Sequence, residues 1–296
     1  MPPQEFTISP LAIRSLTIAV ALTLLSPLLA HAQTPEVPVN GSPYETDLRI
    51  DLPLMIGPLV IAGGAFLIGD ELYTPKCLPD CNAEDVNAFD RPFAGTWDRT
   101  ASTASDVLFI SNLTLPHVFG LADAAMTGDW AGYGTDTIVL VEVMSVTLAI
   151  NTFMSILTQR TRPFVYNTEL SDDLRSSGQA ALSFYSGHAA ASFAMATAYS
   201  YTFMTRHPDS PLVIPLWIGS YLMAGTTAGL RVKAGRHFPS DVLVGAAVGA
   251  ALGMLIPALH LKNKTPTRVE VGGVGMRLLP GAAGAGLGLS VRFDDF

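Results

Sequence analysis

The residues best able to do chemistry lie in three polar clusters of an otherwise apolar chain of 296 residues. In the last cluster, Arg231 precedes His237 by six residues, and His237 precedes Asp241 by four. If residues 237 to 241 are helical, the histidine and the carboxylate share a face, and the carboxylate can accept one ring N–H. The other ring nitrogen is then free to attack phosphorus. This spacing predicts a histidine nucleophile oriented by an aspartate.

The first cluster contains Arg160 and Arg162, and Pro163 follows directly. The planar guanidinium of Arg162 suits two phosphate oxygens, and the proline ends the preceding helix so that this side chain can project from its end. Taken alone, the pair fits solvated arginines at a membrane edge better than a phosphate site.

The middle cluster is Ser186-Gly187-His188, which precedes a run of good helix formers. Serine is a favoured N-cap, glycine lets a ligand approach the backbone, and the free N–H groups at a helix start bind anions. His188 stands beside this predicted phosphate cradle, where its ring can give a proton to a leaving oxygen. A capping serine next to a structural histidine is the alternative.

Together the three clusters resemble the signature of the phosphatidic acid phosphatase type 2 and vanadium-haloperoxidase superfamily. That signature runs Lys, six residues, Arg-Pro; then Pro-Ser-Gly-His; then Ser-Arg, five residues, His, three residues, Asp. The resemblance implies an all-α bundle in which His237 is the nucleophile, Asp241 its orienting partner and His188 the general acid. It assigns the binding of the phosphoryl oxygens to Arg162, Arg231, Ser186 and the backbone of Gly187.

The chain departs from the signature at three positions. Ser155 stands where the family has Lys, Tyr185 where it has Pro, and Leu230 where it has Ser. Only the first change removes a charge, and we expect Arg160 or Lys233 to supply the missing cation. Weaker matches to the entry region of exported family members lie at 87–91 and 105–106.

The resemblance implies a phosphatase for phosphate monoesters or diphosphates that works through a phosphohistidine. No carboxylate cluster lies beside the motifs, so we expect neither a metal ion nor a cofactor. A vanadium haloperoxidase is the first alternative, because vanadate resembles the phosphoryl transition state. A weakened binding protein of the cell envelope is the second. The expected partner is a phosphorylated lipid if the bundle lies in a membrane, or a small phosphate ester if it does not.

Six apolar stretches are long enough to be the helices of this bundle. They are rich in alanine and glycine, which permits close helix packing. Residues 268–293 alternate around Pro280-Gly281 and predict a short β-hairpin in the tail. The six stretches are 52–69, 107–122, 137–157, 180–205, 211–230 and 242–259.

Composition narrows the class of protein. Hydrophobic residues make up 49% of the chain and charged residues 14%, a balance between a water-soluble core and a membrane bundle. A net charge of −8 with scattered basic residues argues against a nucleic-acid binder.

The chain divides into four predicted regions, and its first part predicts export. Residues 1–32 resemble a signal peptide, with Arg14, an apolar run and Ala30-His31-Ala32 before the expected cleavage site. A Pro-rich lead (33–51), the bundle (52–261) and the tail (262–296) follow. Cys77 and Cys81 are too few for a zinc site, and in an oxidising compartment they predict a disulfide. We therefore expect a membrane-associated envelope protein whose site faces the periplasm.

Overall fold

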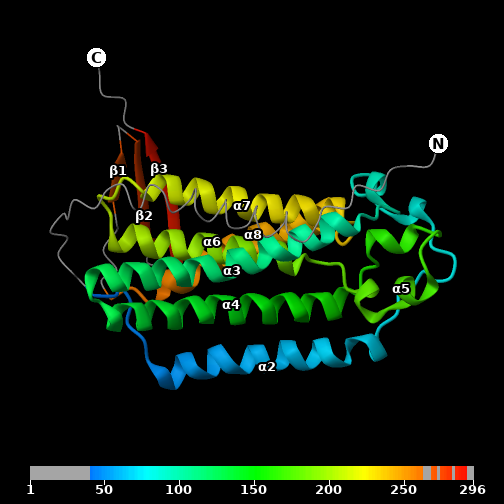
Figure 1. Ribbon diagram of the computed structural model, residues 1–296, viewed down its shortest axis with the longest axis horizontal. Coiled ribbons are helices and arrows are strands. Elements are labelled where there is room, and N and C mark those ends of the chain that lie inside the picture. The colour runs from blue at the N-terminus through cyan, green and yellow to red at the C-terminus, as the bar shows by residue number, and fades with distance from the viewer. Residues whose placement is uncertain (1–40, 263–267, 272–273, 282–283, 292–296) are drawn as a thin grey trace, which may run out of the picture. The chain divides into compact units, whose positions relative to one another are not determined.

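The computed structural model describes residues 41–262 and three strands, at 268–271, 274–281 and 284–291. The predicted signal peptide (1–32) and the first part of the lead lie outside these residues. The described part is an all-α bundle, as predicted, followed by strands (Figure 1). Its α-helices are α2 (Leu48–Leu72), α3 (Arg99–Thr127), α4 (Trp130–Thr158), α5 (Asp172–Ser176), α6 (Gly187–Arg206), α7 (Val213–Lys233) and α8 (Pro239–Leu259). Its 3-10 helices are η1 (Ala83–Asp85), η2 (Arg91–Phe93), η3 (Pro163–Tyr166) and η4 (Gly178–Ala181).

Capping residues explain where the helices begin. The carboxylates of Asp98 and Asp129 accept the backbone N–H groups of Ala101 and Gly132, so α3 and α4 begin seven or more residues before the apolar stretches do. Ser186 caps α6 in the same way, which separates that helix from η4. The predicted stretch 180–205 is therefore two elements, and the segment between them belongs to the site.

Helix α6 lies at the centre of the bundle and packs against α3, α4, α7 and α8. Its closest neighbour is α8, whose glycines Gly245, Gly249 and Gly253 face the α6 backbone. A Cβ added at Gly245 would come within 2.6 Å of the Ser186 carbonyl oxygen, and one at Gly249 would collide with the carbonyl of Ala190. The glycines thus allow the close packing that the sequence predicts.

The outer helices carry large apolar side chains on their free faces. Among the residues that the structure describes, four segments are long and apolar enough to cross a membrane: Arg99–Thr127, Trp130–Tyr166, Val213–Lys233 and Pro239–Leu259. Because such faces are costly in water, they fit contact with lipid. In α6, by contrast, fourteen residues are buried, so its apolar stretch serves the protein core. Exposed side chains on these helices include Ile110, Val118, Leu121, Phe153, Leu157, Ile218, Leu222, Leu243 and Leu259.

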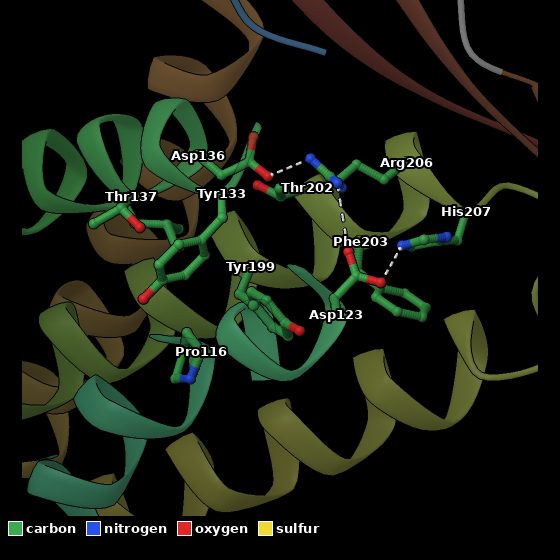
Figure 2. A pocket seen from close by; sticks show the side chains of 12 residues that line it. Pro116, Asp123, Tyr133, Asp136, Thr137, Tyr199, Thr202, Phe203, Arg206 and His207 are labelled. Carbon is green, nitrogen blue, oxygen red and sulfur yellow. Dashed lines mark hydrogen bonds and ion pairs between the residues drawn. The ribbon is translucent and has the colours of Figure 1, made fainter. Parts of the chain in front are cut away.

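A charged cluster joins α3, α4 and the C-terminal end of α6 (Figure 2). The Arg206 guanidinium lies 2.8 Å from Asp129, 2.9 Å from Asp136 and 3.5 Å from Asp123. His207 lies 3.1 Å from Asp123. These largely buried charges are paired with one another, which fits a structural role at this end of the bundle.

The tail strands form an antiparallel sheet in the order β1 (Arg268–Val271), β2 (Val274–Gly281) and β3 (Gly284–Val291). Gly281 pairs with Gly284 across the second turn, so the predicted hairpin is present and a third strand extends it.

Candidate active site

The three motifs meet at one end of the bundle. Arg162 follows the C-terminal end of α4, and Arg231 lies in the last turn of α7. His188 is at the beginning of α6, and His237 lies in the short connection that leads into α8. Helix ends from four separate segments therefore bring together residues that are far apart in the sequence.

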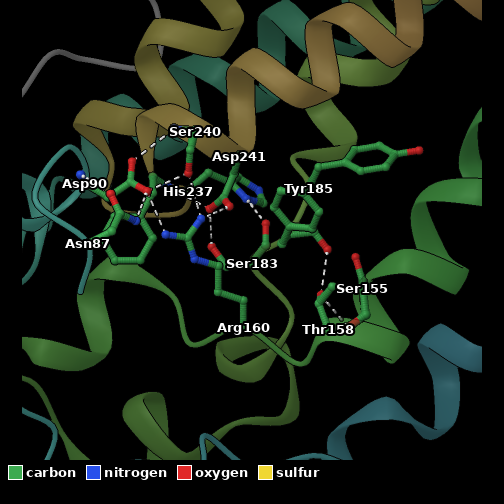
Figure 3. Close-up of polar contacts among 12 residues, drawn as sticks. Asn87, Asp90, Ser155, Thr158, Arg160, Ser183, Tyr185, His237, Ser240 and Asp241 are labelled. Atoms are coloured by element: carbon green, nitrogen blue, oxygen red, sulfur yellow. Dashed lines mark hydrogen bonds and ion pairs between the residues drawn. The ribbon is translucent and has the colours of Figure 1, made fainter. Parts of the chain in front are cut away.

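His237 is buried and held in one tautomer. Its Nδ1 lies 2.7 Å from the carbonyl oxygen of Ser183 (Figure 3), and a carbonyl only accepts, so Nδ1 carries the proton and donates it. Burial, followed by the positive charges of Arg162 and Arg231, lowers the pKa of His237 well below its usual value. The ring is therefore neutral near pH 7, and its Nε2 lone pair is available as a nucleophile.

Asp241 does not orient this ring directly, which corrects the sequence prediction. Helix α8 begins at Pro239 after the extended Phe238, so His237 precedes the helix and does not share a face with Asp241. The Asp241 carboxylate instead accepts the Phe238 backbone N–H at 2.8 Å and the Ser183 hydroxyl at 2.6 Å. Asp241 therefore fixes Ser183, whose backbone carbonyl accepts the Nδ1–H of His237. Ser183 was not among the residues predicted from the sequence.

Arg160 is bound to carboxylates, which corrects a second expectation. It pairs with Asp90 at 2.7 Å and with Asp241, donates to the Ser240 hydroxyl at 2.8 Å, and lies 4.5 Å from the centre of the Phe238 ring (Figure 3). The two carboxylates, Asp90 and Asp241, balance the positive charge of Arg160. Arg160 therefore holds the residues beneath His237 in place and does not supply the additional phosphate-binding cation that the sequence predicted.

Lys233, the other predicted supplementary cation, points to the surface. Its side chain is 68% exposed, and its ammonium lies 3.5 Å from Asp98. An exposed pair of this kind contributes little and does not reinforce a buried site.

Arg162 and Arg231 are the buried cations of the site. The Arg162 Nη2 donates to the Leu182 carbonyl at 3.2 Å, and the Arg231 Nη1 donates to Asp106 at 2.9 Å and to the Ser105 hydroxyl at 3.2 Å. The Nε–H of each arginine is buried and has no hydrogen-bond acceptor within the described part of the chain. Buried donors normally have acceptors, so two unmatched Nε–H groups near His237 fit a site that receives an anion.

His188 is paired with a carboxylate that the motifs do not include. Its Nε2 lies 3.0 Å from Asp106, on the same oxygen that binds Arg231, and its ring lies 4.2 Å from that of Phe109. Burial lowers the pKa of His188, and the hydrogen bond with Asp106 opposes that shift. Asp106 was visible in the sequence only as part of a weak match to the entry region.

The Ser186-Gly187 segment forms the predicted helix cap, and its backbone packs closely against the side chain of Asn151. The Ser186 hydroxyl accepts the Ala189 N–H at 3.4 Å. A Cβ at Gly187 would lie 2.7 Å from the side-chain oxygen of Asn151, so packing already requires glycine here. Asn151 in turn donates to the carbonyl of Tyr185 at 2.6 Å, which fixes the loop before α6.

Arg236 is a further cation near the site that sequence reasoning did not select. Its guanidinium lies 4.9 Å from the centre of the Trp97 ring, and its Nε donates to the Ser102 hydroxyl at 3.2 Å. It also interacts electrostatically with Asp106. The only available sequence signal for Arg236 was its place directly before His237.

Ser155, at the position of the family lysine, is buried in the last turn of α4.

Known proteins resemble the part of the chain that holds these motifs. Residues 136–265 match the family model of the PAP2 superfamily. A lipid A 1-phosphatase of Porphyromonas gingivalis is 40% identical over 84 residues, which are 28% of this chain and 17% of that protein. The chain thus matches about a sixth of the length of this curated relative.

A solved structure is also similar. A transmembrane PAP2-type phosphatidylglycerolphosphate phosphatase of Bacillus subtilis aligns with a TM-score of 0.44 and 19% identity, covering 71% of this chain and 94% of that one. The family match covers all three motifs, from Ser155 to Asp241. The family match therefore supports the resemblance that the motifs carry, and residues 136–265 of this chain are similar to the PAP2 superfamily.

Proposed function

We propose that the protein is a membrane phosphatase that removes phosphate from a phosphorylated lipid through a phosphohistidine on His237, without a metal ion. The observation that carries this proposal is the neutral, tautomerically fixed His237 beside two buried arginines, Arg162 and Arg231, whose Nε–H groups have no acceptor in the described structure. A phosphoryl group matches both features, because it offers an electrophilic phosphorus and anionic oxygens together.

In the first step, the Nε2 lone pair of His237 forms a bond to phosphorus while the bond from phosphorus to the leaving oxygen breaks. His188 gives its proton to that oxygen, and Arg162 and Arg231 hold the non-bridging oxygens. The charge that develops on the His237 ring is shared with the Ser183 carbonyl through Nδ1–H. In the second step, water loses a proton to His188 and its oxygen attacks phosphorus. The bond from phosphorus to the His237 Nε2 breaks, its electron pair returns to Nε2, and phosphate is released with both histidines restored.

A lipid substrate is favoured by where the site lies. Arg162 and Arg231 are at the ends of helices whose outer faces carry exposed apolar side chains. A phosphorylated headgroup at the edge of a bilayer can reach such a site while its acyl chains remain among lipids. The names of the two similar proteins, both phosphatases of lipid phosphates, support the same class. We propose either a monoester or a diphosphate as the reacting group.

We further propose that the site faces the periplasm. Cys77 forms a disulfide with Cys81, and the Cys77 sulfur lies 3.8 Å from the Thr161 hydroxyl. Thr161 lies between Arg160 and Arg162 in the chain. The disulfide and the site are therefore on the same side of any membrane. Because disulfides persist in oxidising compartments, this contact supports a periplasmic site.

Substrate class is tested by comparing phosphate release from a lipid phosphate in mixed micelles with release from a soluble ester. We expect kcat/KM for the lipid phosphate to be the higher of the two, and His237→Ala to abolish both activities. Equal or greater activity toward the soluble ester would contradict the lipid assignment while leaving the phosphohistidine intact. Arg175→Gln is a suitable control, because Arg175 lies outside the motifs and donates to the Val165 carbonyl.

A further inference from the structure

Three ionisable side chains meet at the other end of α8, away from the motifs. Asp51 comes from the first turn of α2, Glu142 from the interior of α4, and His260 follows the last residue of α8. One ligand atom of each lies within 4.8 Å of the other two. The His260 Nε2 is 3.4 Å from Asp51 and 3.2 Å from Glu142.

Both carboxylates are buried and incompletely satisfied. Asp51 is 3% exposed and Glu142 is 4% exposed. The Asp51 Oδ2 and the Glu142 Oε2 have no hydrogen-bond partner among the described residues, and this Glu142 oxygen is the one that faces His260. Buried carboxylates without full pairing are costly, so a cation between them would stabilise the fold.

The histidine is held as metal ligands usually are. The His260 Nδ1 lies 2.9 Å from the Ile256 carbonyl, which only accepts, so Nδ1 carries a proton. That leaves Nε2 directed at the two carboxylates. A backbone carbonyl on the second ring nitrogen is the usual outer contact of a metal-binding histidine. The Glu45 N–H also donates to the His260 carbonyl at 2.7 Å, which fixes its backbone.

A second proton on His260 is the alternative to a metal ion between Asp51, Glu142 and His260. The neighbouring Glu142 raises the pKa of His260 to about 9, so the ring is protonated when no metal is bound. A single N–H serves one oxygen, however, and leaves the cluster with two negative charges and one positive charge. A divalent ion with a neutral histidine balances both carboxylates, and it can bind the unpaired Oε2 of Glu142 together with the Asp51 oxygen that faces His260, Oδ1.

We propose that Asp51, Glu142 and His260 bind a divalent transition-metal ion, with Zn²⁺ as the best match, that joins α2, α4 and the end of α8. Tetrahedral zinc with bonds of about 2.1 Å separates its ligand atoms by roughly 3.4 Å, which agrees with the distances from His260 to both carboxylates. One nitrogen and two oxygen ligands suit zinc better than magnesium or calcium, which prefer oxygen alone.

The role of this ion is structural. The 21 residues of α8 separate His260 from the His237 end of the helix, a distance of roughly 30 Å. An ion at His260 therefore cannot touch the reacting phosphate. It would hold α2, which packs mainly on α4, to the rest of the bundle. The proposal is independent of the phosphatase mechanism.

The test uses the full chain, purified with any affinity tag removed. We expect about one Zn²⁺ per chain by elemental analysis, and a rise of several degrees in Tm when Zn²⁺ is added to chelator-treated protein. His260→Gln and Glu142→Gln should lose both effects. His207→Gln is the matched control, because His207 also pairs with an aspartate at a similar exposure of 15%, against 13% for His260.

Two outcomes would overturn the proposal. The first is wild-type protein that holds no more zinc than His260→Gln and has a Tm that does not respond to Zn²⁺, which would leave a protonated ion-pair cluster. The second is stabilisation by Mg²⁺ in place of Zn²⁺. If the variants fail to fold, Co²⁺ added to the wild type provides the measurement, since a visible absorption band requires direct coordination. Absence of that band would equally contradict the site.

Discussion

Asp106 contacts both a proton donor and a phosphate-binding arginine through one oxygen. Its hydrogen bond with His188 favours the protonated ring, while burial lowers the pKa of that ring. Because the general acid must be protonated, activity should fall as pH rises through the pKa of His188 in the free enzyme.

Asp106→Asn should therefore move this descending limb of kcat/KM to lower pH. Removal of the carboxylate leaves burial and Arg231 to lower the pKa of His188 without opposition. The measurement is a pH–rate profile with one phosphate ester. Asp172→Asn is the control, because the Asp172 side chain is 96% exposed and should leave the profile unchanged. A shift to higher pH in Asp106→Asn would contradict the pairing.

His188 itself should matter in proportion to the leaving group. His188→Ala should lower kcat by about 10²- to 10⁴-fold for an alkyl phosphate, whose leaving oxygen needs a proton. The loss should be much smaller for a nitrophenyl phosphate, whose leaving group departs as an anion. Steady-state rates for the two esters give the comparison. Equal losses would show that His188 binds phosphate and does not donate a proton.

At the scale of helices, the contact between α6 and α8 depends on glycine at particular positions. Gly249→Ala should lower the stability by about 1 to 3 kcal/mol, because its Cβ would collide with the Ala190 carbonyl. Gly219→Ala, on α7, meets no atom within 4 Å and should be neutral or stabilising by about 1 kcal/mol, since alanine favours helix. Thermal unfolding of both variants shows whether close packing or helix propensity controls the effect of each substitution on stability.

How far the sequence predicts the site depends on the kind of contact involved. Arg162, Ser186, His188 and Arg231 lie at helix ends, and proline, serine and spacing reveal such positions. The direct pairing of His237 with Asp241 was wrong because it assumed that a helix covers both residues. Helix α8 begins two residues after His237, and the deciding contact is a backbone carbonyl that has no sequence signature.

The same limit applies to the cations. A sequence shows that Arg160 and Arg236 are near motifs, but it does not show which carboxylates or rings they meet. Arg160 is held by Asp90, which lies 70 residues away in the chain. Such long-range pairs follow from the packing of the whole bundle, whereas the number and order of the apolar helices follow from local composition.

For the molecule as a whole, the proposed orientation in the membrane has a direct test. Cys77 lies beside Thr161 at the site, so both should be accessible from the periplasm. After mild reduction of intact cells, a membrane-impermeant thiol reagent should label Cys77 and Cys81. The Cys77→Ser and Cys81→Ser double variant is the control for background. Labelling that appears only after cell lysis would place the site on the cytoplasmic side.

The central claim is that His237 carries the phosphoryl group, and rapid quench with a labelled lipid phosphate tests it most directly. We expect labelled protein whose phosphate is released in acid and retained in base, as a phosphohistidine requires. The label should be absent in His237→Ala, retained in the control His207→Ala, and unaffected by EDTA added just before the substrate. Label that persists in folded His237→Ala would contradict the mechanism.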